Sequence, residues 1–188
     1  MIAMDAKVDP PPRVLTVPGW ENSGPEHWQS LWERADPHRF HRVEQRDWNA
    51  PRLEDWVQTL DDAIAAETAP VVLVAHSLGC IAIAQWAARF ARPVAGALLV
   101  APADVERADA PDPIRCFAPV PLQPLPFRTL LVASSTDEYL SMDRAGHFAR
   151  CWGSALVSLG AAGHVNTAAG FGPWPQGERL LESLCRQA

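Results

Sequence analysis

Three side chains in this sequence could combine into a reactive hydroxyl group: those of Ser77, Asp137 and His164. A serine hydroxyl is a weak nucleophile until a base removes its proton. An imidazole acts as that base when a carboxylate fixes its tautomer and orientation. Each of the three residues follows an apolar segment of the length of a β-strand. The set therefore predicts attack of the serine oxygen on a carbonyl carbon, with transient acylation of the serine.

Ser77 stands in the motif Ala-His-Ser-Leu-Gly at 75–79, between the apolar run Val71–Ala75 and an alanine-rich helical pattern. A strand, a Gly-x-Ser-x-Gly motif and a helix form the nucleophile elbow, in which a sharp turn presents the serine above a sheet. Gly79 supplies the small residue that the turn needs on one side, and Ala75 departs from glycine by one methyl group on the other. The alternative is that Ser77 only caps the following helix, for which serine is favoured.

Asp137 and His164 follow Ser77 in the chain order that is typical of serine nucleophiles on a parallel sheet. In α/β-hydrolases the serine is followed along the chain by an aspartate or glutamate and then by a histidine. Asp137 comes a short turn after a strand expected at Thr129–Ala133, and His164 lies in a glycine-rich loop after a strand expected at Ala155–Leu159. The order predicts Ser77 as nucleophile, Asp137 as the carboxylate and His164 as the base.

Other carboxylates and imidazoles compete for these roles. Glu138 is adjacent to Asp137, and Asp104 follows another expected strand, so either is an alternative carboxylate. His76 is too close to Ser77 along the chain to act as its base, and we expect it to order the turn or the neighbouring loops. The remaining candidates, which we expect at the surface, are His38, His41 and His147.

Attack on a carbonyl also requires donors for the oxygen that becomes negative, at about 2.7–3.1 Å. In this architecture one donor is the backbone N–H after the nucleophile, here that of Leu78. The second comes from a loop after an early strand, and the segment Pro18–Gly24 is placed for that. We expect Gly19 to let the backbone turn so that the Trp20 N–H points inward. The alternative is a plain Pro-Gly turn.

Apolar runs and helical patterns alternate along the chain, which predicts a parallel sheet with helices on both faces. Residues 1–12 are expected to form a flexible tail, and residues 13–188 a single domain. Residues 104–127, here called the proline-rich segment, contain six prolines and no regular helical pattern, and we expect them above the carboxyl ends of the strands. The expected strands are 13–17, 40–48, 71–75, 94–100, 129–133 and 155–159. The expected helices begin near Pro25 and Pro51 and cover 78–90, 142–152 and 177–186.

Composition narrows the possible partners and compartments. The net charge of −6 and the absence of any lysine or arginine cluster argue against nucleic acid. No apolar run approaches the roughly 20 residues of a membrane helix, and the amino-terminal residues do not resemble a signal peptide. The four cysteines are far apart, which favours a reduced, cytoplasmic protein and no metal site. The eight tryptophans are expected in the core or in a pocket wall.

Four motifs together resemble the small serine hydrolases of the YdeN-like, retinoblastoma-binding serine hydrolase family. The resemblance runs from about Arg13 to Leu184 and implies an α/β-hydrolase fold without a large lid domain, and a Ser-Asp-His triad at Ser77, Asp137 and His164. Members commonly carry proline after the triad aspartate, where this chain has glutamate. The motifs are Val17-Pro18-Gly19-Trp20, Ala75-His76-Ser77-Leu78-Gly79, Ser134-Ser135-Thr136-Asp137-Glu138-Tyr139 and Gly163-His164-Val165-Asn166, with Gly170-Phe171-Gly172-Pro173-Trp174-Pro175 typical of the bacterial branch.

Two functions of different classes follow from these patterns. The first is hydrolysis of a small carboxylic ester, or of a thioester or amide, through an acyl-enzyme and without any cofactor. The second is a binding or scaffolding protein that keeps the fold without useful catalysis, because a fold does not fix a function. Ala75 and Glu138 are the departures that permit the second. The expected partner is a small acyl substrate, and the sequence leaves the oligomeric state open.

Overall fold

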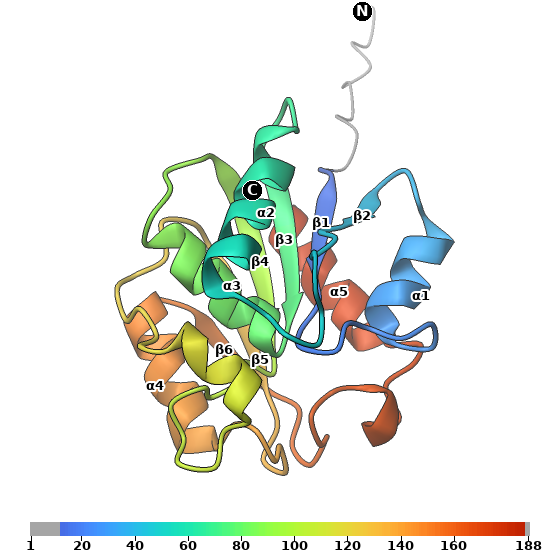
Figure 1. Cartoon of the computed structure of the whole chain (residues 1–188). Helices are drawn as coiled ribbons and strands as arrows, with labels where there is room; N and C mark the ends of the chain where they lie inside the picture. The colour runs from blue at the N-terminus through green and yellow to red at the C-terminus, as the bar shows by residue number, and fades with distance from the viewer. Residues whose placement is uncertain (1–11, 187–188) are drawn as a thin grey trace, which may run out of the picture.

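The computed structural model describes residues 12–186, so most of the predicted amino-terminal tail lies outside the described residues. Within this range one sheet of six strands crosses the molecule in the order β2-β1-β3-β4-β5-β6, and every neighbouring pair is parallel (Figure 1). The strands are β1 (Val14–Val17), β2 (Phe40–Arg42), β3 (Val71–His76), β4 (Val94–Val100), β5 (Thr129–Ala133) and β6 (Ala155–Ser158).

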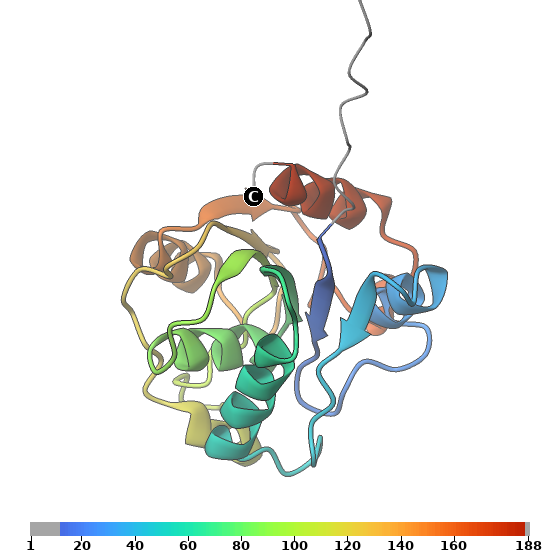
Figure 2. The same ribbon diagram turned by 90° about the horizontal axis from the view of Figure 1, so that it is seen from above.

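Helices cover both faces of this sheet, as parallel crossovers require. The helices are α1 (Trp28–Ala35), α2 (Leu53–Ala65), α3 (Leu78–Ala87), α4 (Met142–Trp152) and α5 (Pro175–Cys185), with short 3-10 turns η1 (Asp112–Phe117) and η2 (Thr167–Ala169). Figure 2 shows the helices on the two faces of the sheet. Side chains of α2, α3 and α4 pack into one core, and those of α1 and α5 into a second. None of the helices in the described part of the chain is long and apolar enough to span a membrane.

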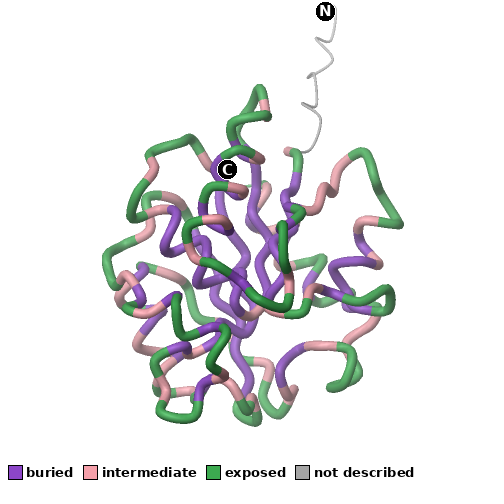
Figure 3. Tube along the Cα trace, in the orientation of Figure 1, coloured by how far each residue is buried: buried purple, intermediate pink, exposed green. Residues whose placement is uncertain are grey.

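The central strand β3 divides the two cores. Leu73 and Ala75 point to the α3 side and Val72 and Val74 to the α1 side, because successive strand residues face opposite ways. All six residues of β3 are buried, and Figure 3 shows the strands as the buried centre of the molecule. Burying each of the valine and leucine side chains of this strand contributes about 1.5–3 kcal/mol. The strand that carries the candidate nucleophile is therefore held from both sides.

Six of the eight tryptophans are buried in these cores, as the sequence predicts, and Trp48 packs against one of them while half-buried. Trp28, Trp32 and Trp174 form an aromatic cluster between α1 and α5, with the rings of Trp32 and Trp174 stacked at 6.0 Å. The cluster fixes α1 against the segment that leads into α5. The other buried tryptophans are Trp56, Trp86 and Trp152.

Some expected boundaries are wrong. The second strand ends at Arg42 instead of Trp48. Residues 43–45 have no regular structure, and a turn follows in which Asp47 accepts hydrogen bonds from the N–H groups of Asn49 and Ala50 at 2.9 Å. The first helix, α1, does not begin at Pro25. It begins at Trp28, where the His27 ring nitrogen accepts the Gln29 N–H and caps the helix.

The proline-rich segment is fixed to the body of the protein by hydrogen bonds to its carbonyl oxygens. Gln85 Nε2, on α3, donates to Phe117 O at 2.6 Å and to Pro119 O at 2.9 Å. The Trp152 indole donates to Pro121 O at 2.8 Å, and the Phe117 ring is fully buried. These contacts make the segment part of the molecular wall, with η1 as its regular turn.

Replacement of Gln85 by leucine tests this anchoring. Gln85→Leu leaves two backbone carbonyls without their donor, so we expect the free energy of unfolding to fall by about 1–3 kcal/mol. We also expect faster proteolytic cleavage within residues 104–127. Denaturant unfolding and limited proteolysis measure both effects. Gln58→Leu, on the exposed face of α2, is the matched control, and equal behaviour of the two variants would contradict the anchoring role.

Candidate active site

Ser77 lies at a strained turn between β3 and α3. Its backbone angles are φ 54° and ψ −121°, in the region that residues other than glycine rarely occupy. Its N–H donates to Val100 O at 3.0 Å, which ties the turn to the neighbouring strand β4. Strain of this kind persists only where the surrounding structure enforces it, and it concentrates at functional sites. Ser77 has no side-chain capping bond to α3, so the simple helix-cap interpretation is wrong.

Close backbone contacts enforce the turn. A Cβ atom at Gly79 would lie 2.2 Å from Val17 O and 2.7 Å from Pro18 O, so α3 can approach the end of β1 only through glycine. A Cβ atom at Gly19 would lie 2.8 Å from the Ser77 Cβ and 3.2 Å from the Leu78 nitrogen. Gly19 is therefore required for this close approach; the left-handed backbone in this loop belongs to Glu21 and Asn22 instead.

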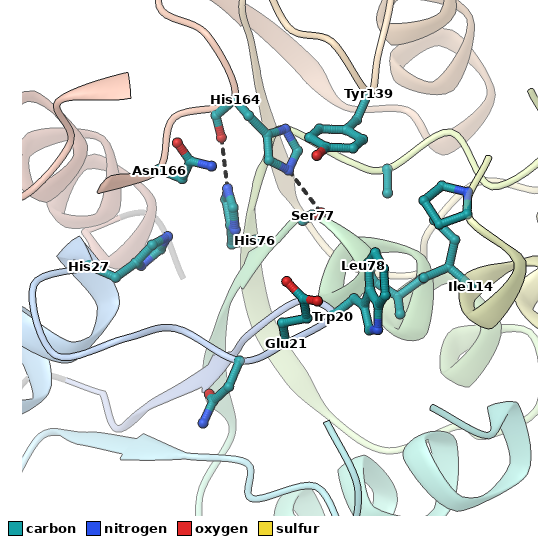
Figure 4. A pocket seen from close by; sticks show the side chains of 13 residues that line it. Trp20, Glu21, His27, His76, Ser77, Leu78, Ile114, Tyr139, His164 and Asn166 are labelled. Atoms are coloured by element: carbon teal, nitrogen blue, oxygen red, sulfur yellow. Dashed lines mark hydrogen bonds between the residues drawn. The ribbon is translucent and has the colours of Figure 1, made fainter. Parts of the chain in front are cut away.

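The three side chains singled out in the sequence meet in one chain of hydrogen bonds. His164 Nε2 lies 2.9 Å from Ser77 Oγ (Figure 4). On the other side of the ring, His164 Nδ1 lies 2.9 Å and 3.0 Å from the two oxygens of Asp137. The Asp137 side chain is fully buried, and His164 is 7% exposed. Since the carboxylate accepts the Nδ1 proton, Nε2 is left to accept the serine proton.

The competing candidates lie elsewhere. Asp104 pairs with Arg144 at 3.3 Å, and Glu138 is exposed, with its backbone carbonyl accepting a hydrogen bond from Arg107. His38 is exposed, and His41 is half-buried beside Arg13 at the far side of the sheet. His147 is half-buried on α4, next to Cys151, instead of facing solvent fully. Neither of these carboxylates and none of these three histidines contacts the chain of hydrogen bonds from Ser77 to Asp137.

The loop that carries His164 is held at two consecutive carbonyl groups. His76 Nε2 donates to His164 O at 2.8 Å, and the Trp28 indole donates to Val165 O at 2.9 Å. Val165 is fully buried with φ 51°, an unfavourable angle for a β-branched residue. Two buried donors thus balance the strain beside the candidate base. The sequence predicted an ordering role for His76 and gave no signal for Trp28.

Two hydroxyl groups join the loop of Asp137 to the loop of His164. Ser134 Oγ accepts the Ala162 N–H at 2.9 Å, and Thr136 Oγ1 accepts the Gly163 N–H at 3.0 Å. Ser134 is buried, so its bond is shielded from water. The sequence places both residues in a motif but does not indicate this role. Which loops lie side by side depends on the order of the strands in the sheet. The bonds set the distance between the carboxylate and the imidazole.

The two residues predicted to supply oxyanion donors, Trp20 and Leu78, line one cavity together with Ser77. Within residues 12–186 the backbone N–H groups of Trp20 and Leu78 have no hydrogen-bond acceptor. Leu78 is the first residue of α3, where a helix leaves its N–H groups free and concentrates positive potential. The Trp20 indole donates to Asn49 O at 3.0 Å, which fixes that side chain and the loop around it. Both N–H groups are therefore free to donate a hydrogen bond.

Ser77 opens into a cavity of about 260 Å³. Burial, with Arg42 and His164 nearby, lowers the pKa of His27 to about 4, and burial holds the pKa of His76 well below its ordinary value. Both imidazoles are therefore neutral at neutral pH. No group of three or more His, Cys, Asp or Glu side chains in the described residues is placed to hold a metal ion. The cavity is lined by Trp20, Glu21, Asn22, His27, His76, Ser77, Leu78, Ala103, Pro111, Ile114, Tyr139, His164 and Asn166.

Comparison with known proteins agrees with this geometry. A family model described as serine hydrolase matches residues 14–183. A YdeN-like hydrolase from Pectobacterium atrosepticum is 37% identical, with a TM-score of 0.83 over 93% of this chain and 90% of that one. The ydeN gene product of B. subtilis is 22% identical, with a TM-score of 0.74 over 92% and 98%.

Proteins of lower sequence identity also share this fold. The RedJ thioesterase of the prodiginine pathway in Streptomyces coelicolor is 15% identical, with a TM-score of 0.63 over 100% of this chain and 97% of that one. A comparison with curated proteins found no match. Fold and family model together define the class as serine hydrolases with the α/β-hydrolase fold, which confirms the predicted fold class. Within that class the chain belongs to the YdeN-like serine hydrolase family.

Gly79→Ala tests the close approach behind Ser77. The added methyl group would overlap the carbonyl oxygen of Val17, so we expect α3 to shift and the free energy of unfolding to fall by about 3 kcal/mol. Gly24→Ala is the matched control, because a Cβ atom there meets no atom within 4 Å. Chemical denaturation of both variants measures the difference. A Gly79→Ala protein as stable as the control would contradict the geometry.

His76→Phe tests the hydrogen bond that holds the His164 loop. Phenylalanine keeps the ring but loses the donor, so we expect kcat for p-nitrophenyl acetate to fall about tenfold as the imidazole loses its position. His76→Gln, which retains an N–H donor, should recover part of that loss. Steady-state kinetics, with melting curves to establish folding, makes the comparison. A kcat equal to that of the wild type in His76→Phe would show that the bond does not position His164.

Proposed function

We propose that this protein hydrolyses small carboxylic esters through an acyl-enzyme intermediate on Ser77. The observation that carries the proposal is the continuous chain from Ser77 Oγ through the His164 ring to the Asp137 carboxylate, with distances of 2.9 Å on both sides of the ring. A buried carboxylate that accepts the Nδ1 proton favours the imidazole tautomer that can act as a base toward the serine.

The proposed reaction has two halves. Ser77 Oγ attacks the ester carbonyl carbon while His164 Nε2 takes the hydroxyl proton, and the Trp20 and Leu78 N–H groups donate to the oxygen that becomes negative. The carbon–oxygen bond to the alcohol then breaks, and His164 returns the proton to the departing oxygen. Water next attacks the acyl group with His164 again as the base, which releases the acid and restores the serine.

The size of the cavity limits the substrate. A cavity of about 260 Å³ lies just below the range of roughly 300–1,000 Å³ that is usual for ligand pockets, which favours a small substrate. Thioesters and amides react by the same steps, and the structurally similar RedJ protein is named a thioesterase, so a small thioester is the nearest alternative substrate. The proposal needs no cofactor and no macromolecular partner. The four free cysteines fit a reducing compartment, and we propose the cytoplasm.

A binding or scaffolding protein is the second candidate. The sequence feature that favours it is Ala75 in place of the first motif glycine. Ala75 is fully buried within β3 and pairs with Val17 and Leu99 in regular register. The methyl group is thus accommodated without distorting the strand that leads to Ser77. A binding protein of this kind would show no turnover that depends on the serine hydroxyl.

Ser77→Ala tests the proposed function. Without the nucleophile we expect turnover of p-nitrophenyl acetate to fall by at least about 10³-fold, while the melting temperature stays close to that of the wild type. Ser135→Ala, which removes an exposed hydroxyl two residues before Asp137, is the matched control and should keep full activity. Ser77→Ala turnover at the rate of the wild type would exclude the acyl-enzyme on Ser77.

A further inference from the structure

The cavity around Ser77 has two chemically different sides. Figure 4 places His27, His76 and Asn166 on one side of the serine, and Leu78 and Ile114 on the other. Ala103, which directly precedes the proline-rich segment, and Pro111 within it add apolar groups to the lining. A substrate that spans the cavity would therefore place one of its ends among hydrogen-bonding groups and the other against hydrocarbon.

His27 has an unused donor on the polar side. Its Nδ1 accepts the Gln29 N–H at 3.2 Å, so in the neutral ring the proton resides on Nε2. His27 is only 5% exposed, and within residues 12–186 Nε2 has no hydrogen-bond partner. A buried donor without an acceptor is unfavourable, and such groups in native structures require an explanation. A substrate oxygen that accepts this N–H would provide one.

A row of rings connects His27 to the base. The His27 and His76 ring centroids are 4.8 Å apart, and those of His76 and His164 are also 4.8 Å apart. Of the two parts of an ester, the departing alcohol must lie next to His164, because His164 returns the proton to its oxygen. The alcohol part therefore extends along the row of histidines, and the acyl part faces Leu78 and Ile114.

We propose that His27 is a specificity-determining residue whose Nε2–H binds a second oxygen on the alcohol part of the ester. This inference rests on the proposed ester hydrolysis and narrows its substrate class to esters of hydroxyl-bearing alcohols with a short apolar acyl group.

The neighbouring groups favour a hydroxyl over a charged substituent. Asn166 uses its Oδ1 to accept the Ala169 N–H at 3.0 Å, and Figure 4 shows its amide nitrogen turned toward His76. Glu21 contributes a carboxylate to the lining, which repels an anionic substituent. An ammonium group would meet the N–H donors of His27 and Asn166. A hydroxyl accepts from such donors and can donate to a carboxylate, so it suits both kinds of group.

A matched pair of esters tests the proposal within each protein preparation. 2-Hydroxyethyl butanoate and propyl butanoate differ by a hydroxyl in place of a methyl group on the alcohol part. We expect the ratio of their kcat/KM values to fall roughly three- to tenfold in His27→Phe relative to the wild type. His38→Phe, at an exposed position, is the control and should keep the wild-type ratio. Because the ratio is internal to one preparation, partial loss of folding cancels.

A second pair locates the hydroxyl. Methyl 3-hydroxypropanoate and methyl butanoate carry the same change on the acyl part, and their ratio should be the same in His27→Phe and the wild type. The proposal is overturned if His27→Phe leaves the first ratio unchanged, or if it changes the second ratio instead. Turnover of p-nitrophenyl acetate with no hydrolysis of either butanoate ester also overturns it, while leaving the proposed hydrolase function intact. If Ser77→Ala were as active as the wild type on all of these substrates, the proposed function itself would be wrong.

Discussion

The buried hydrogen bond between His164 and Asp137 is the interaction on which the rest of the site depends. The Asp137 side chain is fully buried, so it has no water to compete for its oxygens. One of those oxygens also accepts the Tyr139 N–H at 2.8 Å, which fixes the carboxylate within its own loop. A charge-assisted bond in such surroundings is stronger than one in water. It decides which imidazole nitrogen faces the serine, and only the nitrogen without a proton can serve as a base.

The strained backbone at Ser77 and at Val165, next to His164, is maintained by contacts from distant parts of the chain. Ser77 is held by the close approach of Gly79 to the end of β1. The loop of Val165 is held by His76, which donates to His164 O, and by Trp28, which donates to Val165 O. Each of these contacts joins segments that lie in or follow different strands of the sheet, so the six-stranded sheet and the site stabilise each other. The proline-rich segment closes the cavity as a fixed wall, and the polar and apolar sides of the cavity follow from which loops reach it.

Much of the site was predictable because short motifs fix it locally. The pattern at 75–79 specifies a turn, and the order Ser77, Asp137, His164 matches one architecture in which those residues meet. The features that sequence reasoning missed depend on contacts between segments far apart along the chain. Examples are the Trp28 indole, which donates to Val165 O, and the buried His27 Nε2, which has no partner among residues 12–186. The predicted start of α1 at Pro25 is wrong because the ring of His27, two residues further on, supplies the cap.

Covalent labelling tests the central claim most directly. A fluorophosphonate reacts with a serine only when a base activates its hydroxyl, and peptide mass spectrometry identifies the residue that carries the adduct. We predict one stoichiometric adduct on Ser77 in the wild type, and a labelling rate at least about 100-fold lower in His164→Ala, since general-base assistance contributes at least that factor. Absence of an adduct from Ser77, or labelling at the same rate in His164→Ala, would contradict the account.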